Sequence, residues 1–273
     1  MRVRFFAPLS LLALAGCPQH VRSNVGGDAP SSTSASTASS IAPPLPKLEG
    51  AARFAVVELF TSEGCSSCPP ADALLGALVE EARAAHRPLY ALSFHVDYWN
   101  DLGWRDPYSD ASFSARQRDY AHAFHESGVY TPQAIVDGAR GLVGSNEGEL
   151  RASIERALIE ERAAELTLSV TAGDDPSTAN VTFTLTPVVD DAVVAVALVE
   201  RDVVDDVRSG ENAGRTLHHQ NVVRAFETIH AAKQGVVAIA VPASVRRDRA
   251  SVIAFVQRED RSVVAASEGE LTP

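Results

Sequence analysis

The chain has 273 residues, of which 45% are hydrophobic, and a formal net charge of −11 at pH 7. This length is too great for one small domain, so we expect two domains and an N-terminal extension. The negative charge and the lack of a dense basic cluster argue against nucleic acid as a partner.

Residues 1–17 have the pattern of a lipoprotein export signal. Arg2 and Arg4 precede an apolar stretch, residues 5–15, that is too short to span a membrane. The stretch ends in Leu14-Ala15-Gly16-Cys17, which resembles the bacterial lipobox, where the chain is cut before the cysteine and the thiol is acylated. We therefore expect an exported protein anchored through lipidated Cys17 to the periplasmic side of a bacterial membrane. An ordinary secretory signal that contains a cysteine is the alternative.

Residues 18–52 form the expected linker. They are rich in Ser, Thr, Ala, Pro and Gly and show no apolar period, so they cannot bury enough surface to offset the entropy of ordering. If Cys17 carries the lipid, Cys65 and Cys68 are the only thiols left, in a compartment where a disulfide persists.

Residues 53–165 alternate between strand and helix patterns. Apolar runs predict strands, and apolar stripes with helical spacing predict helices. In chain order we expect a strand (54–60), a helix (71–85), a strand (88–96), a helix (112–127), two short strands (134–136 and 141–143) and a helix (147–165). The order β-α-β-α-β-β-α is that of an α/β thioredoxin-like domain, in which helices flank a mixed sheet.

Residues 166–273 consist of β-branched runs without helices between them. The expected strands are 181–186, 192–199, 236–241, 252–256 and 263–266, and residues 210–224 begin as a polar loop and end in a strand. Several short strands in succession predict a β-rich, β-sandwich-like second domain.

A Cys-x-x-Cys motif separates the first strand from the first helix. Cys65 and Cys68 in this place are the signature of a thioredoxin-like redox site, although half of a zinc site has the same spacing. In disulfide exchange Cys65 would attack and Cys68 would resolve the mixed disulfide. Proline favours the first helical position, so the helix is expected to begin at Pro69 or Pro70, with Cys65 about one turn ahead of it.

Thr131-Pro132 occupies the place where thioredoxin-like proteins have a cis proline beside the cysteine pair. It follows the second predicted helix and directly precedes the third predicted strand. We expect a cis bond here, with Thr131 and Pro132 positioning the substrate chain. A trans proline in a turn is the alternative.

Four segments together resemble a known family. The segments FTSEGCSSCPPAD (60–72), HVDYW (95–99) and YTPQ (130–133) resemble an exported bacterial family of unknown function with a thioredoxin-like domain. Residues 210–224 resemble the second domain of the same family. The resemblance implies the fold from residue 54 onward and leaves the function open.

Three functions remain open. The first is a cell-envelope thiol–disulfide oxidoreductase that acts on protein thiols or disulfides through Cys65 and Cys68, without a cofactor. The second is a Cu(I)-binding protein that uses Cys65, Cys68 and His95, because His95 ends the second predicted strand, close to the pair. The third is a non-catalytic binding lipoprotein whose disulfide is structural.

Other candidate residues carry weaker signals. Tyr98, Trp99 and Trp104 either line a substrate groove or fill the core under their loop. The adjacent His218 and His219 are a weak metal signal, because neighbouring residues of a strand point to opposite faces.

Overall fold

The computed structural model describes residues 53–271. The signal and lipidation site expected in residues 1–17, with Cys17, and the linker expected over 18–52 lie outside the described residues. The first seven elements follow the predicted order: β1 (Ala55–Thr61), α1 (Pro69–Ala84), β2 (Leu89–His95), α2 (Ala111–Ala123), β3 (Gln133–Val136), β4 (Gly141–Val143) and α3 (Glu147–Ile159).

The remainder is almost entirely strand. Its elements are β5 (Glu165–Ala172), β6 (Thr178–Thr186), β7 (Ala192–Glu200), β8 (Val203–Asp206), β9 (Thr216–His219), β10 (Val222–His230), β11 (Gln234–Ala240), the 3-10 turn η1 (Arg247–Arg249), β12 (Ala250–Arg258) and β13 (Val263–Glu270). All five strands predicted in this part are present, which confirms the reading of the β-branched runs.

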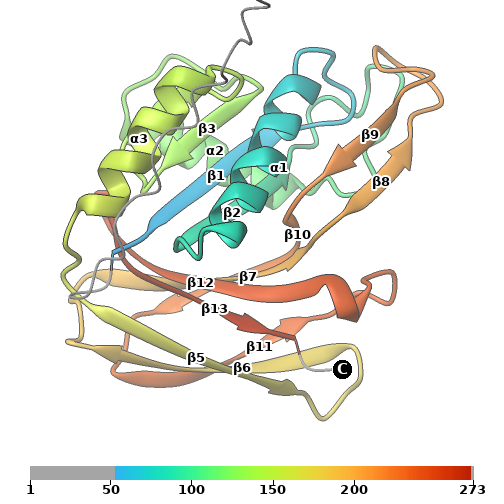
Figure 1. Ribbon diagram of the computed structural model, residues 1–273. Helices are drawn as coiled ribbons and strands as arrows, with labels where there is room; N and C mark the ends of the chain where they lie inside the picture. The colour runs from blue at the N-terminus through green and yellow to red at the C-terminus, as the bar shows by residue number, and fades with distance from the viewer. Residues whose placement is uncertain (1–52, 272–273) are drawn as a thin grey trace, which may run out of the picture. The chain divides into compact units, whose positions relative to one another are not determined.

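One eight-stranded mixed sheet contains strands from both parts of the chain (Figure 1), in the order β13-β12-β7-β10-β2-β1-β3-β4. β1 pairs in parallel with β2 and antiparallel with β3. The two parts meet where β10 pairs in parallel with β2, through Val222 and Ser93. The boundary expected between residues 165 and 166 marks the change from helices to strands, but the sheet continues across it.

Asn221 adds two hydrogen bonds to this junction, both with residues of β2. Its carbonyl accepts from the amide of Ser93 at 2.9 Å, and its side-chain amide donates to the carbonyl of Ala91 at 2.9 Å. The β10–β2 pairing has a single residue pair, and the side chain of Asn221 adds a hydrogen bond to the β2 backbone where further strand pairing is absent.

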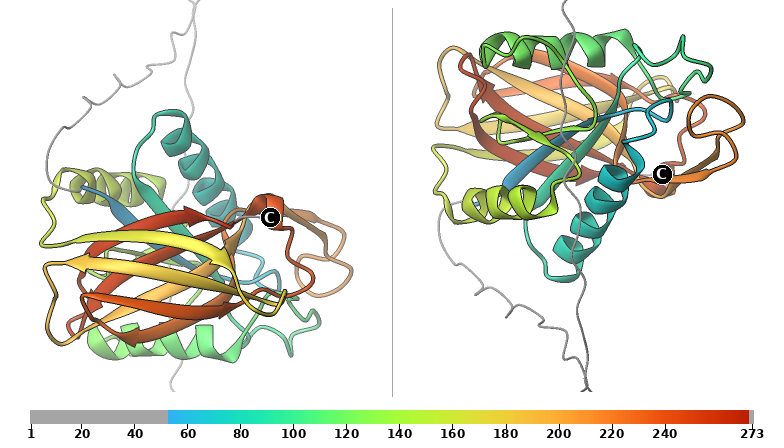
Figure 2. Two further views of the ribbon diagram at one scale, coloured as in Figure 1. Left: turned by 90° about the horizontal axis from the view of Figure 1, so that it is seen from below. Right: turned by 90° about the horizontal axis from the view of Figure 1, so that it is seen from above.

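Three apolar cores fill the spaces between the sheets and the helices. α1 and α3 cover one face of β1 and β3, around Leu59, Leu75 and Ile154. α2 covers the opposite face, as Figure 2 shows, over a core that also includes residues of β7 and β12. The second sheet, β11-β6-β5, packs on the other face of β7 and β12. Among the helices of residues 53–271, none is both long enough and apolar enough to cross a membrane.

The third helix ends earlier than its predicted end at residue 165. α3 stops at Ile159, and Glu160 has an extended backbone. Acidic residues at a helix C-terminus oppose the helix dipole, and Glu160 and Glu161 follow directly. Arg162 turns inward and donates to the carbonyls of Phe54 and Ala157.

Three strands were not predicted. β5 has mostly exposed or half-buried residues, so it lacks a strong apolar pattern. β8 and β9 are four residues each and form a separate two-stranded hairpin.

A buried ion pair connects α2 to the sheet. The Arg116 guanidinium donates to both carboxylate oxygens of Glu58 on β1, at 2.5 and 2.8 Å, and to Gln257 on β12 at 3.2 Å. The Glu58 side chain is 1% exposed, and Tyr120 on α2 also donates to it.

We expect Arg116→Met to lower the free energy of unfolding by about 3–5 kcal/mol, because the variant leaves the Glu58 carboxylate buried without its cationic partner. Urea denaturation measures the change. The matched control is Arg151→Met, which removes exposed ion pairs with Glu81 and Glu147 and should cost less than about 1 kcal/mol. Equal losses in the two variants would contradict the prediction.

Candidate functional site

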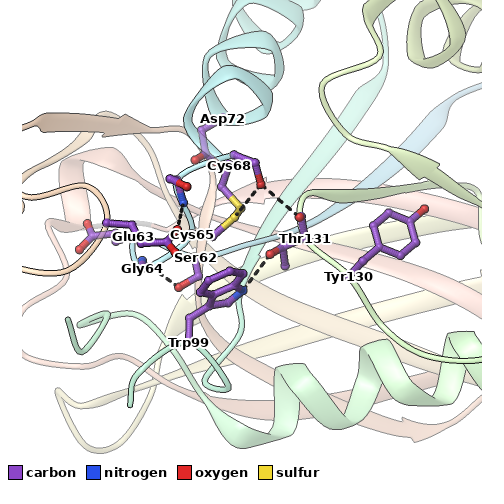
Figure 3. The surroundings of a disulfide bond; sticks show 12 residues. Ser62, Glu63, Gly64, Cys65, Cys68, Asp72, Trp99, Tyr130 and Thr131 are labelled. Carbon is purple, nitrogen blue, oxygen red and sulfur yellow. Dashed lines mark hydrogen bonds between the residues drawn. A yellow bond between two sulfur atoms is a disulfide. The ribbon is translucent and has the colours of Figure 1, made fainter. Parts of the chain in front are cut away.

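Cys65 and Cys68 form a disulfide in the turn between β1 and α1 (Figure 3), with their Cα atoms 5.5 Å apart. The turn is closed by the amide of Cys65, which donates to Ser62 at 3.1 Å, and by the amide of Cys68, which donates to Cys65 at 3.2 Å. Cys68 is the N-cap and Pro69 begins the helix, which confirms the predicted start. Cys65 therefore lies about one turn before α1.

Both cysteines are fully buried, with 0% exposure. The sulfur of Cys65 lies 3.2 Å from the hydroxyl oxygen of Ser67, which is itself exposed. In this disulfide form the two sulfurs are therefore not open to a protein partner.

The structure brings Thr131 next to the cysteine turn. The Thr131–Pro132 bond is cis, as predicted. The Ser67 hydroxyl donates to the carbonyl of Thr131 at 3.4 Å, and the indole nitrogen of Trp99 donates to its hydroxyl at 2.9 Å. Pro132 is buried at the start of β3.

Both tryptophans of the loop after β2 contact the cysteine turn. Trp99 packs so closely on Gly64 that a Cβ atom there would lie 3.0 Å from the Cβ of Trp99. The indole of Trp104 donates to the Glu63 carboxylate at 2.7 Å. The two side chains are half-buried and hydrogen-bonded at the site, whereas Tyr98 is 37% exposed.

Behind the turn lies a buried pair of opposite charges. Nδ1 of His95, at the end of β2, is 2.7 Å from Oδ2 of Asp106. Burial opposes the charged form of each group, but their contact outweighs it, raising the pKa of His95 and lowering the pKa of Asp106. The same Asp106 oxygen accepts from the amide of Glu63 at 2.8 Å, which ties the pair to the cysteine turn.

His219 lies between two buried carboxylates. Its Nε2 is 3.3 Å from the Glu63 carboxylate and its Nδ1 is 3.8 Å from that of Asp72, one helical turn after Cys68. Neither carboxyl oxygen of Asp72 makes a hydrogen bond of ordinary geometry within the described residues, although Thr61 and His219 lie nearby. Burial raises the pKa of Asp72, opposed by His219 and His95. His218 points outward and is exposed, as alternation along a strand requires.

The copper ligands that the sequence suggested do not form a set in this state. Both sulfurs are in the disulfide, and Nδ1 of His95 is bonded to Asp106. Over residues 53–271, no three His, Cys, Asp or Glu side chains are grouped so that they could hold a metal ion.

The loop between β8 and β9, residues 207–215, also reaches the cysteine turn. We call it the hairpin tip. Asn212, which is fully buried, donates to the carbonyls of Glu63 at 2.8 Å and Cys65 at 2.9 Å. The exposed carboxylate of Glu211 accepts from the amide of Ser66 at 3.0 Å.

Sequence reasoning assigned no role to Asn212, Glu211, Asp106, Glu63 or Asp72. For the hairpin tip a signal was present: Gly210 and Gly214 enclose the Glu211-Asn212 pair, and both have positive φ, 76° and 80°. Such glycines indicate a tight, shaped loop rather than a loose connection. What the loop contacts could not be inferred, because its partners lie about 150 residues earlier.

One family model and several solved structures match the chain. The family model described as "Protein of unknown function (DUF1223)" matches residues 56–257. Protein AGR_C_4864 from Agrobacterium tumefaciens has a similar solved structure, with a TM-score of 0.60 and 26% identity over 81% of this chain and 95% of that one. HBP35 of Porphyromonas gingivalis is similar in fold, with a TM-score of 0.58 and 15% identity over 81% of this chain and 76% of that one. No curated protein matches the chain.

The buried carboxyl of Asp72 makes stability depend on pH. Because burial raises its folded pKa above the unfolded value, the folded protein binds more protons than the unfolded chain between these two values, and stability falls as the pH rises through them. Asp72→Asn stays neutral at every pH. We therefore expect its gain in unfolding free energy over wild type to be larger at pH 7 than at pH 4, by on the order of 1 kcal/mol.

Chemical denaturation at the two pH values measures this gain. Asp119→Asn is the control, because the Asp119 side chain is 62% exposed on α2 and should show no such difference. A gain from Asp72→Asn that is the same at both pH values would contradict the prediction.

Proposed function

We propose that this chain, which belongs to the DUF1223 family of proteins of unknown function, is a thiol–disulfide oxidoreductase of the bacterial cell envelope. The observation that carries the proposal is the Cys65–Cys68 disulfide between a strand and a helix, with Thr131 and cis Pro132 beside it. Disulfide exchange requires two sulfurs that can join reversibly and a surface that holds the partner chain. The sulfurs themselves carry the two electrons, so the proposal includes no cofactor.

The proposal includes a thioredoxin-like fold for β1 to α3. The order of the seven elements, the parallel pairing of β1 with β2 and the antiparallel pairing of β1 with β3 support it. Residues 166–273 would then be a β-rich extension that shares the sheet and adds a second layer.

The exchange proceeds in two balanced steps. In the reduced form, the Cys65 thiolate attacks one sulfur of the partner disulfide, so that a mixed disulfide forms and the other partner sulfur leaves as a thiolate. Cys68 then attacks the sulfur of Cys65, the internal disulfide re-forms, and the second partner thiolate leaves. Two electrons pass to the partner, which takes up two protons as its thiolates are protonated. The reverse sequence oxidises a partner dithiol.

Cys65 is the attacking residue in this proposal, because it is the first cysteine of the Cys-x-x-Cys motif and its sulfur lies 3.2 Å from the hydroxyl of exposed Ser67. Thr131 is the positioning residue, since its carbonyl lies next to the cysteine turn, where it accepts from the Ser67 hydroxyl at 3.4 Å. A partner strand that displaces Ser67 would meet this carbonyl next to the sulfurs.

The envelope location is part of the proposal and rests on the sequence. The lipobox-like Leu14-Ala15-Gly16-Cys17 supports export and acylation of Cys17, and the lipid would anchor the chain to the membrane. The partners in that compartment would be protein thiols or disulfides.

A second candidate function has one observation in its favour. Cys65 and Cys68 are both 0% exposed, as in a structural disulfide of a non-catalytic binding lipoprotein. Structural disulfides have reduction potentials below about −300 mV. We expect a higher value for this pair, measured by equilibration with a dithiol buffer; a value in the structural range would favour the second function.

Substitution of each cysteine separates the two steps of catalysis. With a disulfide-containing peptide and dithiothreitol as the reductant, we expect Cys65→Ser to fall to the uncatalysed rate. Cys68→Ser should accumulate a mixed disulfide with the peptide, visible by mass spectrometry, because the resolving thiol is missing.

Cys17→Ser is the matched control, because it removes the remaining cysteine of the chain and should leave the rate of the purified protein unchanged. Undiminished turnover by Cys65→Ser would sink the proposal.

A further inference from the structure

The hairpin tip contacts the peptide group that joins Cys65 to Ser66. Asn212 donates to the Cys65 carbonyl at 2.9 Å, and Glu211 accepts from the next amide, that of Ser66, at 3.0 Å. These two contacts come from adjacent residues of a loop far along the chain. They fix the carboxylate of Glu211 beside the proposed attacking residue.

Glu211 presents a negatively charged carboxylate to the solvent. Its side chain is exposed, and hydrogen bonds from the hydroxyl and the amide of Ser66 hold its pKa below the usual range, so that it is ionised at neutral pH. Ser66 and Ser67, the two other exposed residues of this turn, are neutral. The hairpin tip therefore places the negative charge of Glu211 directly against a turn whose own exposed residues are neutral.

Asn212 fixes the position of the hairpin tip, and with it Glu211, against the cysteine turn. Its side-chain amide is fully buried and uses its donors on two carbonyls of the turn, while the Arg215 guanidinium donates to its oxygen at 3.0 Å. The amide orientation is thereby fixed, because the oxygen faces a donor and the nitrogen faces two acceptors. The tip cannot slide along the turn without breaking these bonds.

We propose that Glu211 is a specificity-determining residue, which selects at Cys65 for disulfide partners with cationic groups next to the reacting sulfur and against anionic ones. The inference deepens the proposed function and rests on it, because it requires Cys65 to react. Electrostatic complementarity acts on encounter and on wrong partners more than on affinity. The net charge of −11 attracts cationic partners to the whole molecule, so the test must separate Glu211 from this general effect.

The test compares exchange of the reduced full-length protein with a cationic, a neutral and an anionic small disulfide of similar size. In wild type we expect the order cationic, neutral, anionic. Glu211→Gln keeps an oxygen that can accept from Ser66, and it should slow the cationic and speed the anionic reagent by about threefold each, relative to the neutral one. Glu211→Lys should reverse the order.

Two controls isolate the local charge. Asp175→Asn removes the same charge from an exposed carboxylate that likewise accepts a backbone amide, that of Ser177, and should leave the ratio of rates unchanged. In 1 M salt, where the Debye length is about 3 Å, the difference between wild type and Glu211→Gln should vanish.

The three reagents and the variants distinguish the proposed function from the proposed role of Glu211. If the neutral reagent does not react with Cys65, both the proposed function and this inference are wrong. If it reacts but the ratio of cationic to anionic rates is the same in wild type and Glu211→Gln, only the selection by Glu211 is overturned. An equal change in Asp175→Asn would also overturn it, because net charge alone would then explain the preference.

Discussion

The parallel pairing of β10 with β2 is the constraint on which the site depends. It consists of the Val222–Ser93 pair and the hydrogen bonds of Asn221. This short junction makes one sheet of the two parts of the chain. Because β9 ends at His219, just before β10 begins, the same junction places the β8–β9 hairpin over the turn that contains the cysteines. The β-rich part thus belongs to the site as much as the helical part does.

Four titratable side chains are buried next to the disulfide. Glu63, Asp106, His95 and His219 each have a side chain with at most 1% exposure, and such groups are rarely buried without compensation. Asp106 contacts His95, and the Glu63 carboxylate accepts from Trp104 and lies 3.3 Å from the His219 ring. The backbone of Glu63 is fixed at both ends, by Asp106 at its amide and by Asn212 at its carbonyl. The cysteine turn is therefore shaped mainly by polar contacts, not by apolar packing.

The sequence was informative wherever the cause of structure is local. Proline preference located the start of α1 at Pro69, and continuous apolar runs identified β1, β2 and β7, which are buried on both faces. The pattern failed for β5, β8 and β9, because these strands are short or largely exposed and are formed by their pairing partners. The residues of the site also differ in whether the local sequence reveals them. Cys65, Cys68, Thr131 and Pro132 were recognisable from spacing and order, whereas Asn212 and His219 reach the turn only through the continuous sheet, which no local pattern encodes.

The shared core has a consequence for the order of events during synthesis. Phe60 and Phe94, which stack at 5.5 Å between ring centroids, belong to the same core as Phe255 on β12. Cys65 and Cys68 leave the ribosome long before that strand exists. While the chain is incomplete, the cysteine turn lacks Asn212 and His219, and the core behind β1 lacks Phe255, so the contacts that bury the two cysteines are not yet complete. A chain interrupted before β12 would leave Phe60 and Phe94 without Phe255, and so with an incomplete core next to the cysteine turn.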